Sequence, residues 1–292
     1  MYADLHLHTN YSDGTYTPEE LAEQGHQRGL KVMALTDHDT VDGCERMVAA
    51  CEERRIEFIT GCEFTVELDG FELHLLGYFL DLKCSRLREE LSKYQSVRQN
   101  RIHEMVAKLN ELGFELTSED VLELANCNSP GRPHIGRAMV AKGHCRTLDE
   151  SFQKYLKKGK PAWVPKAKMT AAHAIELIHE AGGLAVIAHP GLYHRDKVIG
   201  PLVDAGLDGI ECFYTRHSTP MTEHYLMLAE QHGLLVTGGS DCHGENKGRP
   251  LIGGVKLPYS YVAAMKTALA AEDGVVRQIQ GGPAADKGKA VA

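Results

Sequence analysis

Two histidines near the start of the chain have the spacing of a metal-ligand pair. The segment from Asp4 to Asp13 reads D-L-H-L-H-T-N-Y-S-D, so one residue separates His6 from His8. In a β-strand alternate side chains share a face, which predicts that both imidazoles project together while Leu5 and Leu7 enter a core. Paired neutral imidazoles suit Zn, Mn or Fe. One H-x-H is equally compatible with two exposed histidines, so the later segments decide between these interpretations.

Further imidazoles and carboxylates follow short apolar runs along the rest of the chain. They are His38 in T-D-H-D, Glu63, His74, His189 in A-H-P, and Asp241 and His243 in D-C-H. Each alone has an ordinary alternative, namely a solvated loop, a surface charge or a packed, hydrogen-bonded histidine. Together they would gather polar groups at a high cost without a cation, and nitrogen and oxygen ligands without thiolate match divalent metals. The sequence therefore predicts a hydrolase with more than one metal ion.

The elements that must position these groups alternate in a regular order. Thr17-Pro18-Glu19-Glu20 predicts a helix over 18–29, and a short apolar strand follows at 31–36, just before T-D-H-D. The order of helix, strand and polar loop continues beyond a hairpin predicted at Asp69-Gly70. This order is typical of a parallel β/α fold, and about seven such strands favour a closed or nearly closed barrel. The chemistry is then expected at the carboxyl ends of the strands.

The middle of the chain departs from this alternation. A long charged amphipathic helix is predicted at 85–112, and shorter helices are predicted at 118–126 and 133–142. We therefore interpret 86–164 as a mostly helical insertion in an α/β barrel made of 1–85 and 165–280. Residues 281–292, rich in Gly, Ala and Lys, are expected to form a flexible tail.

The composition disfavours several classes of protein. Hydrophobic residues make up 43% and charged residues 25% of the 292 residues, which is ordinary for a soluble globular chain. The formal net charge of -8 disfavours duplex DNA as the main ligand. The sequence has neither an export signal nor an apolar run of roughly 18 residues, so we expect a cytoplasmic protein without a membrane partner. Eight cysteines without a C-x-x-C pair fit reduced thiols, and the oligomeric state is not indicated.

Several segments together closely resemble the motifs of one known family. They are D-L-H-L-H-T-N-Y-S-D-G at 4–14, L-T-D-H-D at 35–39, I-A-H-P at 187–190 and G-S-D-C-H-G at 239–244. They resemble the PHP (polymerase and histidinol phosphatase) family, related to the amidohydrolases, over nearly the whole chain. S-P-G-R-P-H at 129–134 and Y-T-R-H-S at 214–218 resemble its branch of nucleoside 3',5'-bisphosphate phosphatases and 5'-3' exoribonucleases of short RNA. The resemblance implies a distorted (β/α)7 barrel, in agreement with the strand count.

The resemblance also implies a ligand set for two to three divalent metal ions, with Mn expected and Zn or Fe as alternatives. The first ion would be held by His6, His8, Glu63 and Asp241, the second by Glu63, His74 and His134, and the third by Asp13, His38 and His243. His189 would lie at the rim of the third site as a ligand or a phosphate contact. Many members of the family have histidine where Asp13 stands, which leaves two and three ions open.

The reaction implied by this resemblance is hydrolysis of a phosphomonoester on a small phosphorylated nucleotide. Asp241 would take the proton of the attacking water, and His189 or His243 would protonate the leaving oxygen. Four residues are expected to read the substrate, including a second phosphate: Ser129, Arg132, Arg216 and His217. Three alternatives stay open at this point, namely a histidinol-phosphate phosphatase, a hydrolase of short RNA, and a metal-binding accessory module without catalysis.

Overall fold

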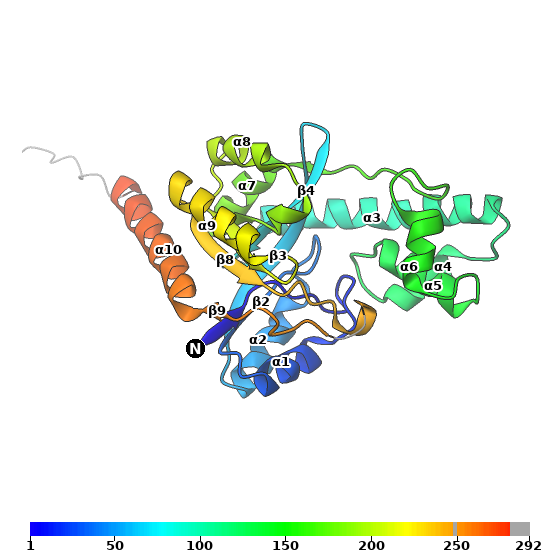
Figure 1. Cartoon of the computed structure of the whole chain (residues 1–292), viewed down its shortest axis with the longest axis horizontal. Helices are drawn as coiled ribbons and strands as arrows, with labels where there is room; N and C mark the ends of the chain where they lie inside the picture. Colours follow the sequence, from blue (N-terminus) through cyan, green and yellow to red (C-terminus); the bar gives the residue numbers. More distant parts are fainter. Residues whose placement is uncertain (248–249, 281–292) are drawn as a thin grey trace, which may run out of the picture.

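The strands of this chain curl into a nearly closed barrel in the computed structural model, which describes residues 1–247 and 250–280 (Figure 1). The strands are β1 (Tyr2–Asp4), β2 (Val32–Leu35), β3 (Glu57–Leu68), β4 (Phe71–Tyr78), β6 (Leu184–Ile187), β7 (Gly209–Tyr214) and β8 (Leu235–Gly239), with short pieces β5 (Met169–Thr170) and β9 (Leu257–Pro258). Their spatial order is β8-β7-β6-β4-β3-β2-β1-β9. The barrel closes where the Leu5 N–H donates to the Gly238 carbonyl at 3.1 Å. The predicted distorted barrel is confirmed.

Two strands, β4 and the short β9, run antiparallel to their neighbours. β1, β2 and β3 pair in parallel, as do β6, β7 and β8, but β4 pairs antiparallel with both β3 and β6. The predicted hairpin at Asp69-Gly70 is present, and both residues adopt positive φ, at 50° and 74°, as a tight hairpin turn requires. The antiparallel pairing of β4 with β3 is what the predicted hairpin requires. The short turn lets β4 return directly beside β3 without a helix between them.

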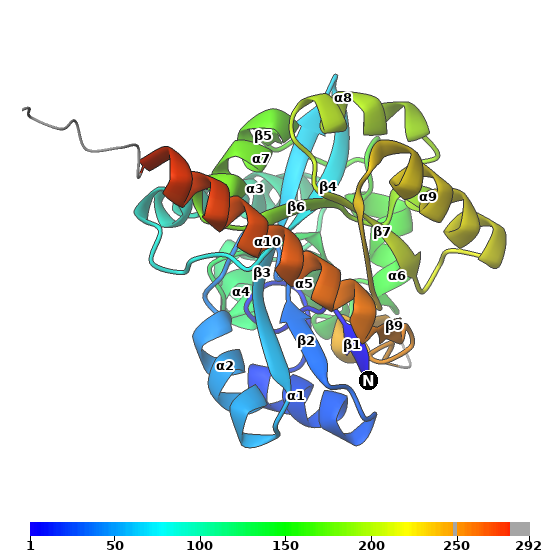
Figure 2. The same cartoon turned by 90° about the vertical axis from the view of Figure 1, so that its left-hand side faces the viewer.

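The core of the molecule has two layers, one inside the barrel and one outside it. Along β2, Val32 and Ala34 pack in the interior cluster, while Met33 and Leu35 pack in the outer cluster against the helices. This alternation is what a strand buried on both faces requires. Helix α10 (Tyr259–Gln280), which the sequence reading did not predict, crosses one side of the barrel in Figure 2 and adds Val262 to the interior cluster.

The outer layer consists of helices that follow the predicted order. They are α1 (Pro18–Gln27), α2 (Cys44–Glu53), α7 (Ala171–Glu180), α8 (Ile199–Asp204) and α9 (Thr219–His232), with short 3-10 turns at Pro190–Leu192, Asp196–Val198 and Gly244–Lys247. The predicted start of α1 is confirmed, because the Thr17 side chain accepts from the Glu20 N–H and Glu20 returns the bond. Among the described residues, no helix is both long enough and apolar enough to cross a bilayer.

The helical segment predicted in the middle of the chain projects from the barrel as an arm (Figure 1). It contains α3 (Ser85–Glu111), α4 (Ser118–Ala125), α5 (Arg132–Ala141), α6 (Leu148–Ser151) and a π-helix at Phe152–Leu156. The arm has a hydrophobic cluster of its own, which includes Ile102, Met105, Ile135 and Met139. Its proposed limits of 86–164 stay a prediction, and the tail predicted at 281–292 lies outside the described residues.

Gly239 lies where β8 passes against the first segment of the chain. A Cβ there would come within 2.3 Å of His6 Cβ and 2.4 Å of the His6 backbone nitrogen. We expect Gly239→Ala to lower the free energy of unfolding by about 2–3 kcal/mol, the range of overpacked sites, and to lower Tm in calorimetry. Gly200→Ala is the control, since its Cβ would meet nothing within 4 Å. Equal melting temperatures for the two variants would contradict this steric argument.

Candidate metal centre

His6 and His8 lie where the first strand has already ended. β1 stops at Asp4, and Leu5 packs in the interior cluster while Leu7 packs in the outer one. β1 is thus shorter than the predicted strand, but Leu7 still forms a parallel bridge with Cys242 beyond β8, and both leucines are buried as predicted. The two imidazoles still converge, with ring centroids 5.2 Å apart. Both side chains are fully buried.

Two turns at strand ends bring His189 and Asp241 toward the same point. His189 follows β6 and Asp241 follows β8, and both have positive φ, at 30° and 54°. Residues other than glycine rarely adopt this backbone conformation, and those that do are concentrated at functional sites. The His189 N–H donates to the Glu211 carboxylate at 2.7 Å, and the Asp241 N–H donates to the His6 carbonyl at 2.9 Å. These bonds hold both turns against the barrel.

Glu63 is the common neighbour of five imidazoles. It lies within β3, not at a strand end as predicted, because β3 continues to Leu68. Its Oε2 lies 3.2 Å from a ring nitrogen of His6, of His8 and of His38, and its Oε1 lies 2.6 Å from His74 Nδ1 and 3.1 Å from His189 Nε2. A carboxylate in this position can serve two adjacent cations.

Three groups of side chains bring their ligand atoms within 4.8 Å of one another. They are His6, His8, Glu63 and Asp241; His38, Glu63 and His74; and His8, Asp13, His38 and His243. The first is the set that the resemblance implied. The other two groups differ from the implied sets. His38 belongs to the group with Glu63 and His74 as well as to the group with Asp13 and His243, and His8 is an additional member of the latter group.

The buried nitrogens of this centre fit a cation and lack hydrogen bonds. Among the described residues, His6 Nε2, His8 Nε2, His38 Nδ1 and His74 Nδ1 are buried without a hydrogen-bond partner. Nitrogen lone pairs facing carboxylate oxygens repel unless a proton or a metal lies between them. Burial lowers the pKa of His8, but the adjacent carboxylates of Asp241 and Glu63 outweigh burial and raise that pKa to about 9. The donor set therefore matches divalent metals with nitrogen and oxygen preference.

Glu211 is a residue that the sequence reading missed. It lies fully buried in β7, in the apolar run G-I-E-C-F-Y, where a single charge inside a barrel strand was the available signal. Its Oε1 accepts from His6 Nδ1 at 2.9 Å, and its Oε2 accepts the His189 N–H at 2.7 Å. The bond to Nδ1 leaves His6 Nε2 as the lone-pair atom that faces Glu63.

We expect Glu211→Gln to weaken metal binding by about 10- to 100-fold, the usual cost of losing a carboxylate behind a ligating histidine. The amide can accept only one of the two bonds that Glu211 accepts. Calorimetric titration of the metal-free protein with Mn measures the change. Asp208→Asn is the matched control, because Asp208 also bonds a histidine, His179 at 2.7 Å, outside the centre. Unchanged Mn affinity in Glu211→Gln would contradict this role.

The remaining predicted residues occupy different places. His134 is buried on α5 and belongs to none of the three groups; its Nδ1 accepts the Gly131 N–H at 3.0 Å, so its role as a ligand stays a prediction. The Ser129 hydroxyl donates to the His38 carbonyl. Both ring nitrogens of His217 are used, by the Cys212 carbonyl at 2.9 Å and the Gly191 N–H at 3.1 Å. Ser129 thus stabilises the backbone at His38, and His217 stabilises the turn that follows His189.

The centre opens into two cavities. A large one of about 900 Å³ is lined by ligand residues and by Leu148, Phe152, Leu192, Tyr214, Arg216 and Leu251, among others. A small one of about 120 Å³ is lined by His38, His74, Arg98, Arg101, Arg132 and Lys166, among others. Phe152 and Pro133 border both. Of the two arginines predicted to read the substrate, Arg132 therefore faces the small cavity and Arg216 the large one.

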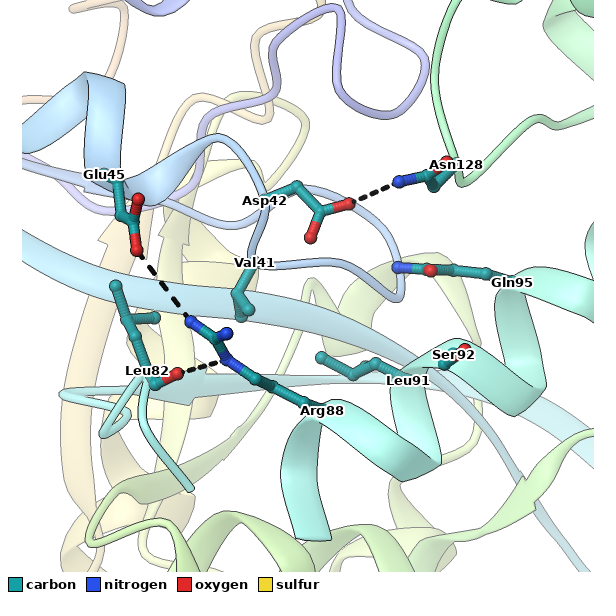
Figure 3. Close-up of a pocket in the computed structure, with 9 residues that line it drawn as sticks. All are labelled: Val41, Asp42, Glu45, Leu82, Arg88, Leu91, Ser92, Gln95 and Asn128. Carbon is teal, nitrogen blue, oxygen red and sulfur yellow. Dashed lines mark hydrogen bonds and ion pairs between the residues drawn. The ribbon is translucent and has the colours of Figure 1, made fainter. Parts of the chain in front are cut away.

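A third cavity of about 340 Å³ lies beside the loop that follows His38 (Figure 3). Its polar side chains are paired with their neighbours: Asp42 accepts from Asn128 at 3.0 Å, and Arg88 donates to the Leu82 carbonyl at 2.6 Å. None of the side chains of the three groups is among its lining residues. The chemistry belongs to the other two cavities.

A sequence model of the PHP domain matches residues 4–158. The chain belongs to the PHP family. The resemblance seen in its motifs is confirmed by the 3',5'-nucleoside bisphosphate phosphatase of Chromobacterium violaceum, 32% identical over 253 residues that cover 84% of this chain and 88% of the relative. The 5'-3' exoribonuclease Rnm of Salmonella typhimurium is 32% identical over 250 residues, covering 82% and 84%.

Solved structures agree with the PHP assignment. One described as a metal-dependent phosphoesterase from Bifidobacterium adolescentis has a TM-score of 0.84 at 31% identity, covering 90% of this chain and 94% of that one. An amidohydrolase from Chromobacterium violaceum with bound sulfate has a TM-score of 0.78 at 31% identity, covering 88% and 92%. The chain is therefore a PHP-domain phosphoesterase, and its three groups of His, Asp and Glu are consistent with a multi-metal site.

Proposed function

We propose that this PHP phosphoesterase removes the 3'-phosphate of nucleoside 3',5'-bisphosphates, giving a nucleoside 5'-monophosphate and phosphate. The proposed cofactors are two to three divalent ions, with Mn preferred. The choice of substrate rests on the small cationic cavity, which adjoins the metal centre at His38 and His74. A substrate with one phosphate at the metals would reach this cavity with a second phosphate, and a plain monoester would leave it empty.

The small cavity is lined by four cations, Arg98, Arg101, Arg132 and Lys166, and by two acids, Asp13 and Glu72, so its lining carries net positive charge. Asp39 pairs with Arg98 at 2.6 Å and with Lys166 at 3.2 Å, whereas Arg101 and Arg132 have no ion pair within 4.0 Å in the described chain. Burial, together with Arg132 and Arg98, lowers the pKa of Arg101 to about 10. Cations that repel one another in a partly dry cavity favour an anionic ligand, and the planar guanidinium of arginine can donate two parallel N–H bonds to the oxygens of a phosphate.

The side chains around the centre can perform the proton transfers of this hydrolysis. Metals held by the three groups would polarise the attacking water and neutralise the phosphoryl oxygens. Tyr214 donates to Asp241 Oδ2 at 2.9 Å, and Asp241 Oδ1 faces His8 at 3.3 Å. Asp241 would accept the proton of the water, and the bond from Tyr214 would hold its carboxylate in place. His189, which borders the large cavity, or His243 would give a proton to the departing 3'-oxygen.

The same hydrolysis would act on short RNA as a second substrate. If the 3'-phosphate is joined to a following nucleotide, water still adds its oxygen to phosphorus and the 3'-oxygen of the first nucleotide still leaves. The products are a 5'-mononucleotide and an RNA shortened by one residue with a 5'-phosphate. The observation that favours this activity is the large cavity of about 900 Å³, which leaves room beyond the reacting phosphate. The relatives named as exoribonucleases support it as well.

The other candidate functions have weaker support. Histidinol phosphate carries an amine, which would meet four cations and only two acids, Asp13 and Glu72, in the small cavity, so the net charge there disfavours it. A metal-binding module without catalysis needs no second cavity beside its metals. We therefore keep the bisphosphate phosphatase as the main proposal.

The test is product analysis on a panel of substrates with Mn-loaded protein. Adenosine 3',5'-bisphosphate is expected to give 5'-AMP and phosphate, and 5'-phosphorylated RNA of a few residues is expected to give 5'-mononucleotides. Chromatography separates 5'-AMP from 3'-AMP. Formation of 3'-AMP, or turnover of histidinol phosphate alone, would overturn the proposal.

A further inference from the structure

The helical arm carries a lysine turn at the mouth of the large cavity. Residues 154–168 read K-Y-L-K-K-G-K-P-A-W-V-P-K-A-K, with six lysines and no acid, in a chain whose net charge is -8. Lys154, Lys166 and Lys168 form ion pairs. Lys157, Lys158 and Lys160 are exposed, and no ion pair of theirs is found among the described residues. We call these last three residues the lysine turn.

The lysine turn has a defined conformation. The Lys160 N–H donates to the Lys157 carbonyl at 2.9 Å, and the Trp163 N–H donates to the Lys160 carbonyl at 3.0 Å. Gly159 between them adopts φ +81°, which glycine tolerates without strain. The turn is anchored by Leu156, which is fully buried in the cluster of the arm. Its three ammonium groups are therefore presented from a fixed backbone.

The lysine turn continues the path that leads away from the metal centre. Phe152 borders both cavities, and Lys157, one turn of π-helix further on, lines the large cavity. Lys158 and Lys160 follow outside it. In an RNA substrate the small cavity would hold the 5'-phosphate of the first nucleotide, so the rest of the strand must leave through the large cavity. Its phosphates would then meet the lysine turn.

We propose that the lysine turn at 157–160 binds the backbone phosphates of single-stranded RNA downstream of the scissile bond. This inference rests on the proposed action on short RNA and extends it. A basic track beside an aromatic side chain is the usual surface for single strands without sequence preference. A mononucleotide bisphosphate has no downstream phosphate and does not reach Lys158 or Lys160.

The experiment compares Lys158→Ala/Lys160→Ala with the wild type on 5'-phosphorylated pentaribonucleotide and on adenosine 3',5'-bisphosphate. Loss of two phosphate contacts should make the slope of log kcat/KM against log salt less negative by about 1.4, at about 0.7 per contact on single strands. We expect KM for the RNA to rise about ten-fold at low salt and kcat/KM for the bisphosphate to stay within about two-fold.

The control is Lys31→Ala/Lys83→Ala, which removes the same charge from exposed lysines of the barrel. It should leave the slope unchanged. An unchanged slope for Lys158→Ala/Lys160→Ala, with RNA cleaved by both proteins, would overturn this inference and leave the proposed function standing. A wild type that hydrolyses the bisphosphate but never RNA would overturn the inference and the proposed action on RNA, and would leave the bisphosphate phosphatase standing. A wild type that hydrolyses neither substrate would overturn all of them.

Discussion

Replacing Glu63 with glutamine is expected to lower kcat for bisphosphate hydrolysis by about 10³-fold or more, the scale on which enzymes lose central charge-stabilising groups. Glu63 contributes a carboxylate oxygen to two of the three ligand groups, and five imidazoles surround it. The pKa of Glu63 is raised by burial but held well below its usual range by His38, His74 and His6, so it is anionic at neutral pH. A neutral amide removes that charge without changing the shape.

The effect on metal binding and the effect on folding can be separated for this variant. Steady-state phosphate release measures kcat, and elemental analysis of the purified variant should show fewer ions per chain. His103→Ala is the control, since His103 is an exposed histidine on α3 and should retain full rate and metal content. Full activity in a folded Glu63→Gln protein would contradict the assignment of Glu63 to the metal centre.

Replacing Arg132 with methionine is expected to lower kcat/KM for adenosine 3',5'-bisphosphate by about 10- to 100-fold. Hydrogen bonds to charged groups are worth about 1.5–3 kcal/mol, and 1.4 kcal/mol corresponds to a factor of ten. Arg132 lines the small cavity, and the pKa of its guanidinium is lowered, first by burial. For 3'-AMP, which lacks the 5'-phosphate, kcat/KM should change by less than about three-fold.

The comparison of two substrates makes this prediction specific. A general disturbance of the arm would lower kcat/KM for both substrates equally and would contradict a role in reading the second phosphate. Arg132 lies over the Phe152 ring at 5.8 Å, and Arg195 lies over the Phe71 ring at 4.5 Å. Arg195→Met is therefore the matched control, because Arg195 is exposed and lines neither cavity. Its kcat/KM should stay unchanged for either substrate.

The sequence predicted the barrel because its signals are local. The capping box at Thr17, the Asp69-Gly70 turn and the short apolar strands each depend on neighbouring residues. The convergence of His6 and Asp241 was predictable too, since the carboxyl ends of barrel strands meet at one rim. What could not be predicted was the end of β1 at Asp4 and the separate clusters of Leu5 and Leu7, because the closure of the barrel against Gly238 is a contact between distant segments.

The residues that hydrogen-bond to the candidate ligands could not be predicted either, because their partners are also distant in the sequence. Glu211 bonds a histidine 205 positions earlier in the chain, and nothing in G-I-E-C-F-Y specifies that partner. His217 looked like a substrate contact in Y-T-R-H-S, yet both of its ring nitrogens bond backbone groups. The ion pair of Lys166 with Asp39 at 3.2 Å joins residues 127 positions apart, and no local pattern indicated it. Burial and pairing depend on tertiary packing, which sequence spacing does not record.

The most direct test of the central claim is one titration of metal-free protein with Mn, in which bound metal and phosphate release from adenosine 3',5'-bisphosphate are measured on the same samples. The metal-free protein should be inactive, and activity should rise with bound Mn to a plateau at two or three ions per chain, no more than one for each ligand group. Full turnover by protein that holds far less than one ion per chain would contradict the account.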